Sequence, residues 1–143
     1  MPIIFTEHTK QDNRYGPTNK DHYYQPAQYH NATAKDRNKY KSLWIISEPH
    51  QYCIFEYADE NEWYVNEFIV GLNVDNKKKL LPLGQDNEKI AIFRSNDNTK
   101  INWHGYPINA KDIDNSFDEF FCRLKENNII SKAICKRLVK NMI

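Results

Sequence analysis

The 143-residue sequence has only four glycines and three cysteines, and it has no long apolar run. The glycines form neither a G-x-x-x-x-G-K nor a G-x-G-x-x-G loop, which disfavours nucleotide-dependent chemistry. No C-x-x-C pair occurs and no histidine has a ligand partner at zinc-site spacing, so we expect no disulfide framework, no metal and no cofactor. Neither a run of about 20 apolar residues nor a signal-like segment after Met1 is present. These absences predict one cytoplasmic domain without a membrane partner.

Cations are missing from one part of the chain. No Lys or Arg occurs between residues 42 and 76, although seven Asp and Glu fall inside this window. The net charge is +3 over residues 1–42, −7 over residues 43–122 and +5 over residues 123–143. We therefore expect the middle of the chain to present a negative field.

Local patterns predict an α+β fold with four segments. Residues 1–42 are polar, rich in tyrosine and broken by proline, and they suggest an extended arm. Residues 43–94 predict an antiparallel β-meander, with strands at 43–47, 52–58, 63–74, 80–83 and 88–93. Residues 95–115, which contain the sequence Trp-His-Gly-Tyr-Pro, predict a connecting loop.

The last segment, residues 116–143, predicts a helical hairpin on one face of the sheet. Ser116 and Glu119 have the spacing of a capping box, and Ser131 can cap a second helix. Asn127 and Asn128 can supply a left-handed stop between the two helices. We therefore expect an antiparallel sheet of four or five strands, with the arm lying over it.

The cation-free window is also rich in aromatic residues, and its seven carboxylates are interleaved with them. Aromatic residues can anchor an interface while a negative rim attracts a basic partner. We therefore hypothesise a non-enzymatic module of the immunity or antitoxin type, which covers a basic, nuclease-like site on a partner protein. The residues expected to contact the partner are Glu56, Tyr57, Asp59, Glu60, Glu62, Trp63, Tyr64 and Glu67.

The segment from Trp103 to Pro107 supports an alternative hypothesis. His104 and Tyr106 could act as base and acid in metal-independent RNA cleavage, with Arg94, Lys100 or Arg123 holding the phosphate. The interpretation that we favour for this segment is structural, with Gly105 at a positive φ in a packed turn.

A third hypothesis is a helix-turn-helix regulator. Lys132, Lys136 and Lys140 recur on one side of the last helix and could contact phosphates. The net charge of −7 over residues 43–122 disfavours nucleic acid as the partner. The sequence leaves the oligomeric state open.

Overall fold

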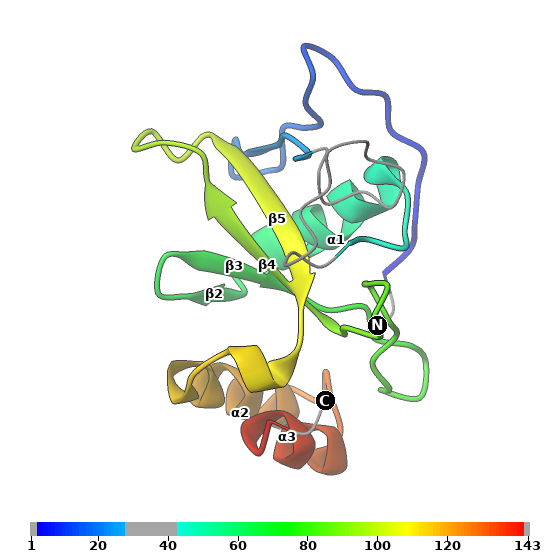
Figure 1. Cartoon of the computed structure of the whole chain (residues 1–143), viewed down its shortest axis with the longest axis vertical. Coiled ribbons are helices and arrows are strands. Elements are labelled where there is room, and N and C mark those ends of the chain that lie inside the picture. The colour runs from blue at the N-terminus through cyan, green and yellow to red at the C-terminus, as the bar shows by residue number, and fades with distance from the viewer. Residues whose placement is uncertain (1–2, 28–42, 142–143) are drawn as a thin grey trace.

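The computed structural model describes residues 3–27 and 43–141, and it shows an α+β fold with one five-stranded sheet (Figure 1). The strand order is β1-β5-β4-β3-β2. β1 runs parallel to β5 and the other neighbours are antiparallel, so the sheet is mixed rather than purely antiparallel. The strands are β1 (Tyr23–Tyr24), β2 (Tyr64–Val65), β3 (Phe68–Gly71), β4 (Ile90–Ser95) and β5 (Asn102–Ile108), and the helices are α1 (Glu48–Glu60), α2 (Asp118–Glu126) and α3 (Lys132–Val139).

The strand predicted at 52–58 is wrong, because these residues belong to helix α1, which packs against the sheet. Pro49 lies in the first turn, where its fixed φ suits a helix and its missing N–H costs nothing. Buried residues recur at helical spacing, as Gln51, Ile54, Phe55 and Ala58 show. The aromatic and β-branched residues of this stretch favoured a strand in the sequence, whereas packing on the sheet selects the helix.

The long strand predicted at 63–74 is a hairpin instead. β2 and β3 pair antiparallel with Val65 opposite Phe68, which leaves Asn66 and Glu67 as the turn. Asn66 has a φ of 55°, a left-handed conformation that asparagine tolerates better than most residues. The segments predicted as strands at 43–47 and 80–83 contribute only isolated bridges, Trp44 with Gly84 and Leu80 with Val74.

The loop predicted at 95–115 contains strand β5, so the segment from Trp103 to Pro107 is part of the sheet. Trp103, Gly105 and Pro107 are buried, and the residues between them are half-buried, as strand alternation requires. Gly105 does not have the predicted positive φ. It is opposite Phe93 on β4, and a Cβ atom there would lie 2.7 Å from the carbonyl oxygen of Ile92. Glycine is therefore needed here for close packing rather than for backbone conformation.

The C-terminal helix pair is present as predicted, with one difference in capping. The Ser131 hydroxyl accepts the Ile134 N–H at 3.1 Å and caps α3. Asn128 has a φ of 60° and supplies the left-handed stop after α2. The capping box at Ser116 is not formed, because the Asp114 side chain accepts the Ser116 N–H and a 3₁₀ turn, Asn115–Phe117, precedes α2.

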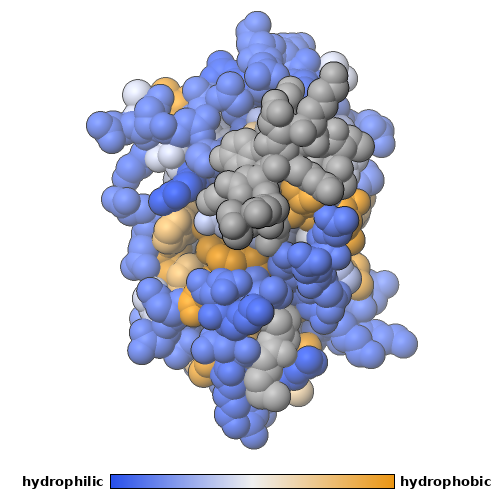
Figure 2. Space-filling model, viewed as in Figure 1, coloured by the Kyte–Doolittle hydropathy of each residue, from blue (hydrophilic) through white to orange (hydrophobic). Residues whose placement is uncertain are grey.

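The described part of the predicted arm, residues 3–27, packs against α1 and the β5 edge of the sheet; residues 28–42 lie outside the described residues. Tyr15 stacks on Tyr52 of α1, and Tyr24 is fully buried against Phe55 and Phe93. The arm is therefore part of the core. Hydrophilic side chains cover most of the face seen in Figure 2.

Candidate functional site

The candidate site lies where the C-terminal end of α1 meets the β2–β3 hairpin. Of the eight residues predicted to contact a partner, the six with exposed or half-exposed side chains are here called the acidic face: Glu56, Tyr57, Glu60, Glu62, Tyr64 and Glu67. The carbonyl groups at the end of a helix carry partial negative charge, which adds to that of the carboxylates.

Asp59 and Trp63 are buried, and they support the acidic face from inside. Trp63 is 6% exposed, and its ring contacts those of Tyr57 and Phe120. Asp59 is 0% exposed. Neither side chain can be part of a contact surface, so two of the eight predicted contact residues lie instead in the interior beneath the acidic face.

The Asp59 carboxylate is the centre of a buried hydrogen-bond network. It accepts the Thr18 hydroxyl at 2.5 Å and the Tyr64 hydroxyl at 2.8 Å. His22 Nδ1 lies 3.0 Å from both Asp59 oxygens. Burial, followed by the hydrogen bond to Asp59, raises the pKa of Tyr64, so this phenol stays protonated and donates at neutral pH. The network joins the arm, α1 and β2.

The arm also places polar groups beside the acidic face. Lys20 Nζ lies 3.6 Å from a Glu62 carboxylate oxygen, and the Asn19 backbone N–H donates to Glu60 at 3.3 Å. At the other end of α1, Lys10 pairs with Glu48 at 3.0 Å. Exposed pairs of this kind contribute about 0–1 kcal/mol, so a partner's cations could replace them at little cost.

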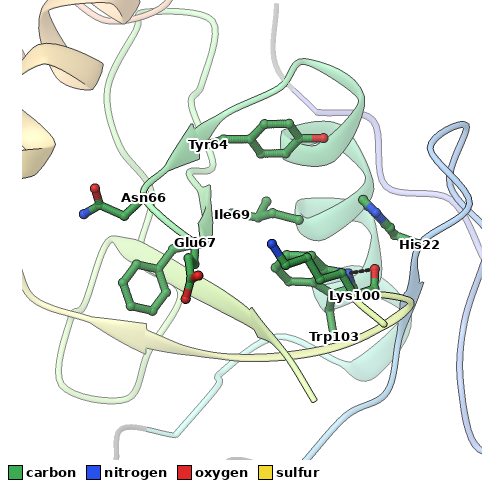
Figure 3. Close-up of a pocket in the computed structure, with 8 residues that line it drawn as sticks. His22, Tyr64, Asn66, Glu67, Ile69, Lys100 and Trp103 are labelled. Carbon is green, nitrogen blue, oxygen red and sulfur yellow. Dashed lines mark hydrogen bonds between the residues drawn. The ribbon is translucent and has the colours of Figure 1, made fainter. Parts of the chain in front are cut away.

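A cavity of about 230 Å³ opens beside the acidic face, between the β2–β3 hairpin and the β4–β5 loop (Figure 3). Figure 3 shows His22 and Glu67 on opposite sides of it, with the amine of Lys100 directed toward the hairpin. Its volume is below the range of drug-sized pockets, about 300–1,000 Å³, and suits a single side chain. The lining residues are His22, Tyr64, Asn66, Glu67, Phe68, Ile69, Lys100 and Trp103. The sequence did not associate His22 or Lys100 with the acidic window, because both lie in segments far from it along the chain.

The residues of the ribonuclease hypothesis are only partly brought together. His104 and Arg94 are cross-strand neighbours, and Tyr106 is two residues from His104 on the same face of β5. His104 Nδ1 contacts the Asn96 side chain at 2.5 Å. Arg123 is on α2, where its guanidinium lies 5.7 Å from the Phe120 ring centroid.

Other features of the chain are placed as follows. Lys132, Lys136 and Lys140 are exposed on α3 and at its end. All three cysteines are free thiols. Within residues 3–27 and 43–141, no group of three His, Cys, Asp or Glu is arranged to hold a metal ion. No helix in this part of the chain has the length and apolar character needed to cross a membrane.

Comparisons with known proteins found no match among protein-family models, curated proteins or solved structures. The functional argument therefore rests on the geometry of the acidic face and its cavity.

Proposed function

We propose that the acidic face binds a basic protein, and that the chain is an inhibitor of the immunity or antitoxin type that covers a nuclease-like site. One observation carries the proposal: Glu60 at the end of α1, Glu62 before β2 and Glu67 in the turn of the β2–β3 hairpin are all exposed, in a sequence window without Lys or Arg. A nuclease site that holds phosphates is positive, and carboxylates at an interface can occupy the positions of those phosphates.

The surroundings of these carboxylates favour binding to a protein. Tyr57 and Tyr64 are half-exposed beside them, and tyrosine provides contact area with little loss of side-chain entropy. The Asp59 network and the packing of Trp63 on Phe120 hold the helix end and the hairpin in place. A surface that is already rigid loses less entropy on association.

The proposal can be tested with the proteins encoded by adjacent genes, titrated into this protein by calorimetry. Raising salt from about 0.01 to about 1 M shortens the Debye length from about 30 to about 3 Å, so the affinity of the true partner should fall steeply. Replacing Glu60, Glu62 and Glu67 together by lysine should weaken binding at least about 100-fold, mainly through slower association.

Glu126→Lys is the matched control, because it reverses an exposed charge on α2 without touching the acidic face. This variant should bind within about twofold of the wild type, since one remote charge is screened. If no adjacent gene product binds, if salt leaves the affinity unchanged, or if the triple variant binds as tightly as Glu126→Lys, the proposal is wrong.

A further inference from the structure

Hydrogen-bond acceptors dominate the cavity beside the acidic face. A carboxylate can only accept, so the contacts of Asp59 with His22 Nδ1 place the imidazole hydrogen on that nitrogen. In the neutral ring, Nε2 then has a free lone pair. His22 lines the cavity, so in this neutral form its second nitrogen is an acceptor at the cavity wall.

Two other lining groups, Tyr64 and Trp103, have used their donors elsewhere. The Tyr64 hydroxyl donates to Asp59, and Trp103 Nε1–H donates to the Lys100 carbonyl at 2.9 Å. The Asn66 amide donates one of its two hydrogens to Ser116 at 3.1 Å, and its oxygen is an acceptor. Glu67 adds an exposed carboxylate. Lys100 is the one lining side chain that brings a positive charge.

Aromatic and aliphatic side chains form the rest of the wall. Phe68, Ile69 and Trp103 line the cavity, and Trp103 is 6% exposed. The protein's own Arg94 lies with its guanidinium 5.7 Å from the Phe68 ring centroid. A guanidinium is therefore already placed beside this hairpin. Arginine combines a planar group that stacks on aromatic rings with five donors, which matches a wall of rings and acceptors.

We propose that the cavity receives an arginine side chain of the basic partner. The guanidinium would donate to the Glu67 carboxylate and to His22 Nε2, with its plane against Trp103 or Phe68. The amine of Lys100 must move away as the arginine enters, and Lys100 is exposed and on a loop. This inference rests on the proposed function, and it specifies the anchor residue of the partner. Buried arginine anchors of this kind dominate the energetics of many interfaces.

The inference can be tested without the partner, by titrating capped arginine (N-acetyl-arginine methylamide) into the isotope-labelled full chain. The indole N–H signals of the three tryptophans report the position, and Trp103→Phe assigns the one in the cavity. Only the Trp103 signal should shift progressively, with a dissociation constant in the millimolar range, as is usual for a fragment of this size. Capped citrulline, the uncharged analogue, should bind at least about fivefold more weakly.

Two variants separate a cation site from an anion site. Glu67→Gln removes the facing carboxylate and should weaken capped arginine about three- to tenfold. Lys100→Ala removes the competing cation and should tighten it about two- to fivefold. Capped glutamate is the opposite probe, and Lys100→Ala should not tighten its binding. Glu126→Gln is the matched control and should change no constant by more than about 1.5-fold.

The inference is overturned if capped arginine does not shift Trp103, if citrulline binds equally well, or if Lys100→Ala weakens arginine. Tighter binding of capped glutamate than of capped arginine would also overturn it. Arginine binding without any adjacent gene product binding would contradict the proposed function alone. Partner binding that is unchanged by Glu67→Gln, with no shift from capped arginine, would contradict only this inference.

Discussion

Replacing Gly105 by alanine should destabilise the fold, although alanine is usually the better residue in a strand. Gly105 pairs with Phe93 across β4 and β5. An added Cβ atom would lie 2.7 Å from both the Ile92 carbonyl oxygen and Phe93 Cε1, and even closer to Phe93 Cδ1. The Ile92 oxygen belongs to the sheet backbone, and the Phe93 ring is held among Tyr24, Trp44 and Phe55. Neither neighbour can move without disturbing the core.

The size of the effect follows from these contacts. Inserting a methyl group into a packed core costs about 1–3 kcal/mol, and the backbone contact favours the upper end. Alanine loses less backbone entropy than glycine on folding, which offsets only about 0.5–1 kcal/mol of this cost. We expect a net loss of about 2 kcal/mol. The unfolding entropy is about 2.1 cal/mol/K per residue, or about 0.3 kcal/mol/K for a chain of this length, so the melting temperature should fall by about 7 °C.

Urea denaturation of the wild type, Gly105→Ala, Phe93→Leu and the double variant measures this cost. Leucine lacks Cε1 and the rigid ring, and its Cδ methyl groups can rotate away from the new methyl group, so the double variant should be at least about 1 kcal/mol more stable than the sum of the single effects predicts. His104→Ala, on the opposite face of β5, should cost less than about 1 kcal/mol. A Gly105→Ala protein within about 0.5 kcal/mol of the wild type, or strict additivity with Phe93→Leu, would refute the packing argument.

Three further predictions concern other parts of the fold. Ser131→Ala should lower the unfolding free energy by about 1 kcal/mol, because the cap on the Ile134 N–H is lost. Lys132→Ala in the same turn should change the unfolding free energy by less than about 0.5 kcal/mol. Equal effects of the two variants in urea denaturation would argue against the cap. Arg14→Ala should lower the unfolding free energy by about 1–2 kcal/mol in the same measurement, because the guanidinium lies 3.6 Å from the Tyr23 ring centroid and donates to Asn102 at 2.7 Å. Arg14→Lys should retain only part of this stability, because lysine lacks the planar guanidinium. Burial, followed by the nearby Glu48 carboxylate, raises the pKa of Tyr15 from 10.0 to about 12, so the folded state holds this proton more tightly than the unfolded state does. The stabilisation from this proton should be complete below pH 10 and lost between about pH 10 and 12. Over this range the unfolding free energy should therefore fall more steeply in the wild type than in Tyr15→Phe.

The sequence predicted the C-terminal helix pair and strand β4 because their signals are local. Phe120, Phe121 and Leu124 recur at helical spacing, and Ser131 caps the next helix without help from distant residues. Helix α1 was missed because its aromatic and β-branched composition favours strands. The same residues also carry helix signals, Pro49 at the first turn and apolar residues three and four apart, and in the folded protein this spacing outweighs composition.

Strand β5, in contrast, could not be predicted from its own residues. Gly105 and Pro107 both disfavour strands, and their place in the sheet depends on their partners Phe93 and Ala91 on β4. The cavity could not be predicted from a local pattern either, because His22, Glu67 and Lys100 come from three separate segments. Sequence periodicity reports which face of an element is buried, but it does not report which distant elements meet. The acidic face was within reach of the sequence because residues 56–67 form it alone.

The segregation of charge along the chain also has a second meaning in the folded protein. The positive N-terminal arm contacts the negative window itself, through Lys10 with Glu48 and Lys20 with Glu62. The absence of cations from that window therefore serves internal docking as well as any partner.

The buried and the exposed contacts of the arm have different roles. Asp59 lies inside and is hydrogen-bonded to Thr18, His22 and Tyr64, whereas the Lys20 pair is exposed and weak. A basic partner could thus displace Lys20 from the acidic face while the arm stays held by Asp59. Lys20→Ala should then increase affinity for that partner and leave the melting temperature nearly unchanged, and weaker binding would mean that the arm itself forms part of the interface.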